Sequence, residues 1–211
     1  VSTAGVATFA GRDLREEPLG RHPPPHVDEG YLLTKWAGEL FLERVAAASE
    51  GLLAATVHRT AALVGPGAPE LDIVSSVVRY SLAVGAVPTL EGYGGRIQFV
   101  PVEEVARAMV DASLGAEAAA GGIRYRNHCS ADAHLTVDLS DLGTYCKRSL
   151  GQTGSLPVLG DDEWIEKAEA AGFPPLLGDL ISGRTRLVAR ERLLGCYSEP
   201  RRGQERHVKL E

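Results

Sequence analysis

A helix-length apolar pattern followed at once by a short apolar run is the feature that most limits the fold of this chain. Between residues 29 and 49, apolar residues recur at steps of three and four, which predicts an amphipathic helix with one buried face. Gly51 follows, and the run 52–57 is too short for a helix and indicates a buried parallel strand. Helix, glycine and strand make half of a βαβ unit, so we expect an α/β fold. The apolar helix residues are Leu32, Leu33, Trp36, Leu40, Phe41 and Val45.

The same alternation continues along the chain. Asp72 precedes an apolar stretch that we expect to end as a helix at Gly85, because glycine is a common helix stop. Pro101 opens a second helix, with acidic residues in its first turn where the helix dipole favours them. The expected strands are 97–100 and 123–126, the expected loop is 64–69, and the expected helices are 72–84, 101–114, 139–150 and one that starts at Asp161 and turns Trp164 toward the core.

Composition excludes several classes of function. The 211 residues, 44% of them hydrophobic, suffice for a core, and the net charge of -6 gives no electrostatic reason to bind nucleic acid or an anionic membrane. No apolar run reaches the ~18 residues of a membrane span. The three cysteines, Cys129, Cys146 and Cys196, lack the spacing of a zinc site. We therefore expect reduced thiols, no metal and a soluble cytoplasmic protein.

Tyr31 and Lys35 are the residues that introduce chemistry. They lie four residues apart on the predicted helix, so their side chains share one face, one turn apart. A free tyrosine, with a pKa of ~10, is a poor proton donor at neutral pH, but a neighbouring cation stabilises the phenolate and lowers that pKa. The remaining donors of Lys35 can bind a sugar hydroxyl. Such pairs also occur by chance on solvated helices. The surrounding sequence must therefore decide between a catalytic pair and a chance pair.

The surrounding sequence resembles a known superfamily. Residues 1–6, VSTAGV, suggest the carboxyl end of a parallel strand, where open α/β sheets place their ligands. Strand-end hydroxyls followed by Tyr and Lys on the next helix resemble the extended short-chain dehydrogenase/reductases. The blocks VSTAGV, GYLLTKWAGELFLERV, GLLAATVHRTAALVG, Asp72-Ile73-Val74 and FVPVEEVARAMV resemble the carboxyl-terminal part of the thioester reductase domains of nonribosomal peptide and hybrid polyketide synthetases, over about residues 1–180.

This resemblance implies a Rossmann-like α/β fold and a set of site residues. Thr3 would hydrogen-bond the substrate carbonyl, Tyr31 would give the carbonyl oxygen a proton, and Lys35 would hold the nicotinamide ribose. Four residues that follow the predicted strand would pass close to the nicotinamide together with Tyr31 and Lys35. They are His58, Arg59, Thr60 and Ala61.

Some of these residues have a second interpretation. His58 also suits internal packing, and Arg59 suits either a phosphate contact or a structural ion pair. Thr60 stands where the family usually has proline, so the loop path there departs from the family. Trp164 and Phe173 suit either an acyl channel or the core.

The implied reaction is reductive release. NADPH, with NADH left open, would deliver hydride to a thioester carbon held on the phosphopantetheine arm of an upstream carrier protein. The thiohemiacetal would collapse to an aldehyde, and a second hydride can give the alcohol. The chain would then act as a monomeric domain of a larger synthetase.

The Gly-rich turn that cradles a dinucleotide is not found in this sequence. Gly65-Pro66-Gly67 and residues 92–95 lack the GxGxxG spacing. The chain is then either part of a larger reductase or a remnant without its cofactor half, acting as a non-redox carrier- or substrate-binding or cyclising release module. We favour the reductase because Thr3, Tyr31 and Lys35 are all present. We expect residues 1–115 to form the carboxyl-terminal part of the Rossmann-like domain, and residues 116–211 a smaller, mostly helical substrate-binding subdomain with a tail.

Overall fold

The computed structural model describes residues 1–6, 14–19, 30–67, 69–91, 95–115, 121–129 and 135–182. Their contacts form two compact units that interleave along the chain. The first unit holds the described residues of Val1–Gly65 and Gln98–Leu135, and the second holds those of Pro66–Ile97 and of the stretch from Thr136 onward. Each unit is described by itself below.

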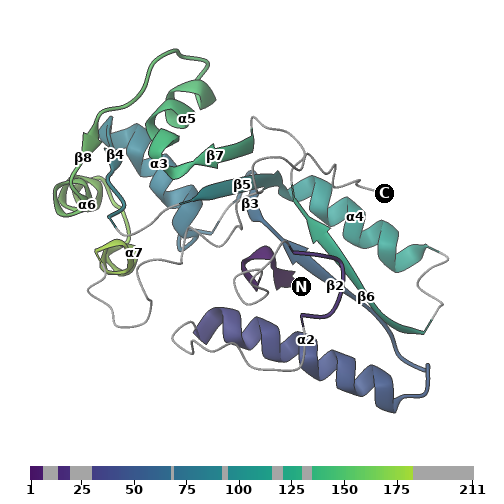
Figure 1. The fold of residues 1–211 in the computed structure, drawn as a ribbon. Helices are drawn as coiled ribbons and strands as arrows, with labels where there is room; N and C mark the ends of the chain where they lie inside the picture. The colour runs from purple at the N-terminus through teal and green to yellow at the C-terminus, as the bar shows by residue number, and fades with distance from the viewer. Residues whose placement is uncertain are drawn as a thin grey trace. The chain divides into compact units, whose positions relative to one another are not determined.

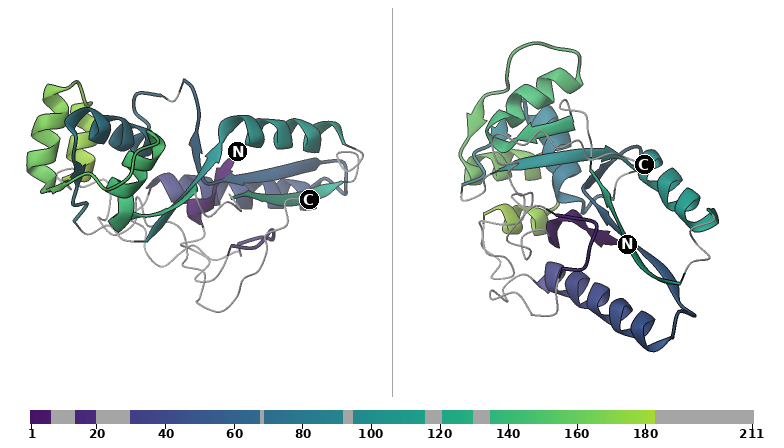
Figure 2. Two further views of the ribbon diagram at one scale, coloured as in Figure 1. Left: turned by 90° about the horizontal axis from the view of Figure 1, so that it is seen from above. Right: turned by 45° about the vertical axis from the view of Figure 1, so that its right-hand side comes forward.

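The first unit is built on a parallel sheet of three strands. Strands β1 (Ser2–Thr3), β2 (Ala54–Thr60) and β6 (Gly122–His128) lie in the order β1-β2-β6. Helix α2 (Gly30–Ala48) packs against all three strands, and α4 (Val102–Leu114) packs against β2, with the sheet between the two helices (Figures 1 and 2). The predicted α/β fold is confirmed.

The register of this sheet determines which residues lie side by side. Thr3 is the partner of Thr60, and β2 pairs with β6 along its whole length. Because β6 belongs beside β2, the contacts do not follow the single boundary that we expected after residue 115.

Strand β2 begins and ends later than the sequence predicts. The apolar run suggested a strand over 52–57, but Leu52 is 93% exposed and the strand is Ala54–Thr60. Its end is set by the pairing with β6, which a short apolar run does not reveal. Strand β3 (Ala62–Val64) follows at once and pairs in parallel with the end of β5 (Arg96–Pro101), so Val64 lies in a strand and not in the expected loop.

Helix α2 buries only part of the apolar face that its periodicity predicts, because Leu33, Trp36 and Leu40 are half-buried. Leu32 is buried, but Phe41 is 65% exposed and Val45 is exposed as well. The inward side carries polar anchors instead: Glu39 is buried, and Glu43 accepts a hydrogen bond from a tyrosine of β6. The buried side of the helix therefore combines apolar residues with charged and polar groups, and hydrophobic periodicity alone cannot predict the polar part.

The second unit is mostly helical around a small aromatic core. It contains α3 (Ile73–Val84), η4 (Leu139–Asp141), α5 (Leu142–Ser149), α6 (Asp161–Ala170) and α7 (Pro175–Ile181), with the short strands β4 (Val87–Pro88), β7 (Thr136–Asp138) and β8 (Val158–Leu159). Trp164 is fully buried, and its indole N–H donates to the Ala86 carbonyl at 2.8 Å. Phe173 meets Trp164 edge to face at 5.1 Å, so both rings belong to the core.

The expected helices of the chain are present with nearly the expected ends. Helix α3 starts at its N-cap Asp72, whose carboxylate accepts from the Ser75 N–H at 2.7 Å. It stops at Gly85, which adopts a left-handed conformation with a φ of 76°. Helices α4 and α6 begin directly after Pro101 and Gly160 with acidic first turns. In the part of the chain that the structure describes, no helix is long and apolar enough to span a membrane.

Two buried histidines join β2 to β6. His58 Nδ1 lies 2.7 Å from His128 Nε2, and the rings stack with centroids 5.0 Å apart. Burial, followed by repulsion from His128 and Arg126, lowers the pKa of His58. Burial also lowers the pKa of His128, where Glu16 acts in the opposite direction. The folded state therefore favours the neutral rings.

Removing the cap of α3 should destabilise the protein. We expect Asp72→Ala to lower the free energy of unfolding by ~1 kcal/mol, because the Ser75 N–H loses its acceptor. Glu70→Ala removes the same charge from an exposed side chain two residues away and should leave stability unchanged. Urea unfolding of both variants checks this expectation, and equal losses would contradict it.

The histidine pair makes stability depend on pH. The native pKa of each ring lies below the unfolded value of about 6.5, so below that pH the unfolded chain binds more protons. The free energy of unfolding should therefore fall as pH drops through about 6.5, and level off below the native pKa. The double variant His58→Gln/His128→Gln should lose less stability between neutral and mildly acidic pH. The free energies of unfolding of both proteins are measured by urea unfolding at a series of pH values. If the double variant loses as much stability with falling pH as the wild type, the pair does not cause the effect.

Candidate functional site

Tyr31 and Lys35 lie together on the first turns of α2. The Lys35 ammonium is 5.5 Å from the centroid of the Tyr31 ring, as expected for residues one turn apart. The same ammonium donates to the carbonyl of Val1 at 3.4 Å. Lys35 therefore connects the phenol to the chain at the start of β1. Tyr31 is 64% exposed.

Thr3 lies at the end of β1, beside the strand that carries the other predicted site residues. Its Oγ1 accepts a hydrogen bond from the Gly5 N–H at 3.2 Å, at the turn into the 3-10 helix η1 (Ala4–Val6). A hydroxyl that accepts in this way still has its own proton to donate. The register places Thr3 directly opposite Thr60.

The four residues from His58 to Ala61 mostly direct their side chains to partners inside the first unit. His58 binds His128, and Thr60 is buried. The side chain of Ala61 joins a small apolar cluster with Val100 and Val105. Their expected contact with a nicotinamide stays a prediction, while the internal interpretation of His58 agrees with the geometry.

Arg59 forms the structural ion pair that was one of its two interpretations. Its Nε and Nη2 donate to the two oxygens of Glu39 at 3.1 and 2.7 Å. Its guanidinium also donates to the carbonyls of Arg15 and Glu17 at 2.9 and 3.0 Å. Arg59 is 0% exposed and Glu39 is 3% exposed. Sequence reasoning missed Glu39, although a carboxylate one turn after Lys35 and an arginine inside an apolar strand were both visible.

Tyr125 of β6 completes the packing around this ion pair. The Arg59 guanidinium lies 4.4 Å from the centroid of the Tyr125 ring, and the Tyr125 hydroxyl donates to Glu43 of α2. Burial, with the hydrogen bond and charge of Glu43, raises the pKa of Tyr125 well above its ordinary value. The phenol therefore stays neutral and acts as a structural donor.

The residues present fit part of a nicotinamide dinucleotide. An ammonium such as that of Lys35 has donors enough for ribose hydroxyls beside its bond to Val1. Arg59 does not suit a phosphate, because it is fully buried and its guanidinium is bound to internal acceptors. Among the residues with described positions, no group of three or more His, Cys, Asp or Glu side chains is arranged to hold a metal ion.

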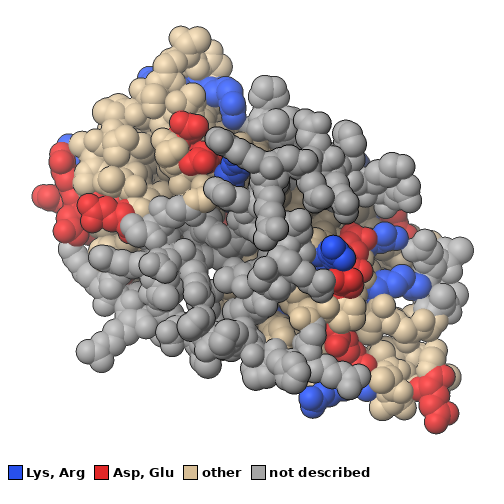
Figure 3. Space-filling model, viewed as in Figure 1, with Lys and Arg blue, Asp and Glu red and all other residues tan. Residues whose placement is uncertain are grey.

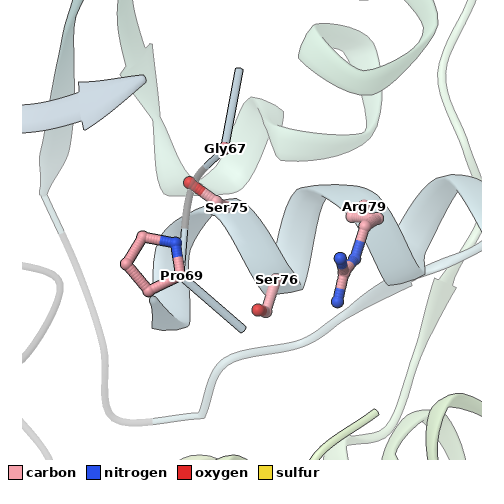
Figure 4. Close-up of a pocket in the computed structure, with 5 residues that line it drawn as sticks. All are labelled: Gly67, Pro69, Ser75, Ser76 and Arg79. Atoms are coloured by element: carbon pink, nitrogen blue, oxygen red, sulfur yellow. The ribbon is translucent and has the colours of Figure 1, made fainter. Parts of the chain in front are cut away.

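Two hollows lie apart from Thr3, Tyr31 and Lys35. In the first unit, a hollow of about 480 Å³ between the sheet and α4 is lined by His58, Thr56, Arg124, Met109 and neighbouring small residues. In the second unit, a hollow of about 290 Å³ lies along the start of α3 (Figure 4) and is lined by Gly67, Pro69, Ser75, Ser76 and Arg79. Thr3, Tyr31 and Lys35 line neither of them.

Charged side chains of both signs are spread over the face shown in Figure 3. Acidic groups gather over α6, whose first turn carries Asp161, Asp162 and Glu163.

Comparison with known proteins gives these residues a context. The NAD-binding family model described as Male sterility protein matches residues 2–109, which includes β1, α2 and β2. The chain is 44% identical over 174 residues to the hybrid PKS-NRPS synthetase ucsA of an Acremonium species. That match covers 82% of the chain and 4% of the synthetase.

Solved structures show the same fold. The terminal R domain from the myxalamid PKS-NRPS pathway matches with a TM-score of 0.53 and 24% identity, over 92% of this chain and 47% of that one. A thiolation-reductase di-domain from an archaeal non-ribosomal peptide synthetase matches with a TM-score of 0.51 and 14% identity, over 88% and 39%. The chain thus spans half or less of the length of these structures.

The family match covers about half of the chain and includes the strand with Thr3 and the helix with Tyr31 and Lys35. The fold agrees with that of the terminal reductase domain. The chain therefore belongs to the NAD-binding family described as Male sterility protein, and it matches a small segment of a hybrid PKS-NRPS synthetase.

Proposed function

We propose that this chain forms part of a terminal reductase domain that releases a thioester-bound product as an aldehyde with NADPH. The observation that carries the proposal is the Tyr31–Lys35 pair, with the ammonium 5.5 Å from the phenol ring and bonded to the Val1 carbonyl beside Thr3. A phenol, an ammonium and a strand-end hydroxyl are the groups needed to polarise a carbonyl and protonate its oxygen.

Three residues share the work on the substrate. The Thr3 hydroxyl donates a hydrogen bond to the thioester carbonyl oxygen and polarises the carbonyl, and it keeps its proton. Tyr31 gives its proton to the same oxygen as the carbon is reduced, and the Lys35 ammonium stabilises the phenolate that forms. When bound, the nicotinamide supplies the hydride for the carbonyl carbon.

The product of this step is a thiohemiacetal. Its carbon–sulfur bond then breaks, the hydroxyl oxygen becomes the aldehyde oxygen, and its proton passes to the departing pantetheine sulfur. Tyr31, as phenolate, would carry this proton from the hydroxyl to the sulfur. The chain's own contribution is therefore a positioned proton and a polarised carbonyl.

The relatives suggest the substrate carrier. The relative from Acremonium is a hybrid synthetase, and one structural neighbour joins a thiolation domain to its reductase domain. We accordingly propose an upstream carrier protein with an acyl or peptidyl thioester as the partner. The His58–Ala61 stretch, beside Thr3 in the sheet, would lie near the nicotinamide. Both described cysteines are free thiols, which suits the reducing cytoplasm that we propose as the compartment.

Replacing the phenol tests the mechanism. We expect Tyr31→Phe to lower kcat for carrier-bound thioester reduction by ~10²–10⁴-fold in the intact protein, because the carbonyl oxygen loses its proton donor. NADPH oxidation and aldehyde formation are measured together. The control is Tyr80→Phe, which removes a hydroxyl bonded to the Gly172 carbonyl in the second unit and should leave kcat unchanged.

Two outcomes would contradict the proposal in different ways. Unchanged NADPH oxidation by Tyr31→Phe would remove Tyr31 from the mechanism. Release of a cyclised product by the wild-type protein without NADPH oxidation would instead identify a non-redox release domain.

A further inference from the structure

We propose that the Glu39–Arg59 ion pair is a positioning device that fixes Tyr31 and Lys35 relative to Thr3. The inference rests on the proposed function of those three residues. It concerns a pair that touches no substrate and acts through its neighbours.

The first step is the place of Glu39 on α2. Glu39 follows Lys35 by one helical turn and Tyr31 by about two, so all three side chains leave the same side of the helix. Any rotation or sliding of α2 that moves Glu39 must also move Tyr31 and Lys35.

The second step is the place of Arg59 in the sheet. Arg59 directly precedes Thr60, the register partner of Thr3. Its guanidinium donates to both oxygens of Glu39, at 3.1 and 2.7 Å. A bidentate contact of this kind fixes the orientation of the guanidinium relative to the carboxylate. The ion pair thus holds the side of α2 that carries Tyr31 against the part of β2 that pairs with β1 at Thr3.

The third step is that the same guanidinium also binds the segment between β1 and α2. Arg59 donates to the carbonyls of Arg15 and Glu17, which belong to the connection between β1 and α2. One buried cation therefore holds the strand, the connecting segment and the helix together.

The fourth step is energetic. A buried ion pair is costly to desolvate, and a well-packed apolar pair of similar size often gives equal or greater stability. Stability alone is therefore a weak reason for so fully buried a pair, whereas a defined geometry for the proton donor is a sufficient one. An error of ~1 Å at a reacting group can cost ~10²-fold in rate.

The test separates geometry from stability. In the intact protein, Arg59→Met/Glu39→Leu replaces the ion pair by apolar side chains, and Glu39→Gln keeps the shape of the side chain without its charge. We expect the folded variants to lose ~10- to 100-fold in kcat with little change in the KM for the thioester. The matched control, Lys167→Met/Glu163→Leu, removes an exposed ion pair of α6 and should retain wild-type kcat.

Hydrogen–deuterium exchange gives a readout that does not depend on activity. Amides of residues 31–38 should exchange faster in the folded Glu39 and Arg59 variants than in the wild type, while the exchange rates of amides in α4 should not change. Wild-type kcat and wild-type exchange in a folded Glu39→Gln variant would overturn the proposal, even if the double variant fails to fold. A wild-type protein that reduces no thioester, while the exchange of α2 still responds, would overturn the proposed function and leave the positioning role supported.

Discussion

A buried ion pair, Arg59 with Glu39, connects several elements of the first unit. Arg59 sits inside a parallel sheet, fully removed from solvent, and its guanidinium needs acceptors that water would otherwise supply. Glu39 supplies two of them and the carbonyls of Arg15 and Glu17 supply the others. Tyr125 adds its ring face to the same cation. A helix, two strands and a connecting segment therefore take positions that satisfy a single side chain.

This constraint explains why α2 exposes apolar residues. A helix docked only by hydrophobic burial would turn its apolar stripe to the sheet. Here Glu39 and Glu43 must face Arg59 and Tyr125, so Phe41 is left exposed. The same orientation places Lys35 where its ammonium reaches the Val1 carbonyl, beside the strand end that carries Thr3.

The general fold and the adjacency of Tyr31 and Lys35 were predictable from the sequence because both depend on short-range spacing. The i, i+4 relation of Tyr31 and Lys35 and the capping of α3 by Asp72 need no tertiary information. The Glu39–Arg59 pair joins residues twenty positions apart, and only the docking of α2 on β2 brings them together. The ends of β2 and the existence of β3 likewise follow from pairing with other strands, and short segments carry no periodicity that would reveal it.

The fate of the nicotinamide hydrogen tests the central claim most directly. The intact protein would be given a carrier-bound thioester and NADPH deuterated at C4 of the nicotinamide, each stereoisomer in turn, and the released product analysed by mass spectrometry. Reductive release predicts an aldehyde in which the former thioester carbon carries deuterium from one stereoisomer and not from the other. A released acid or cyclic product without deuterium, with no NADPH consumed, would contradict the reductase account.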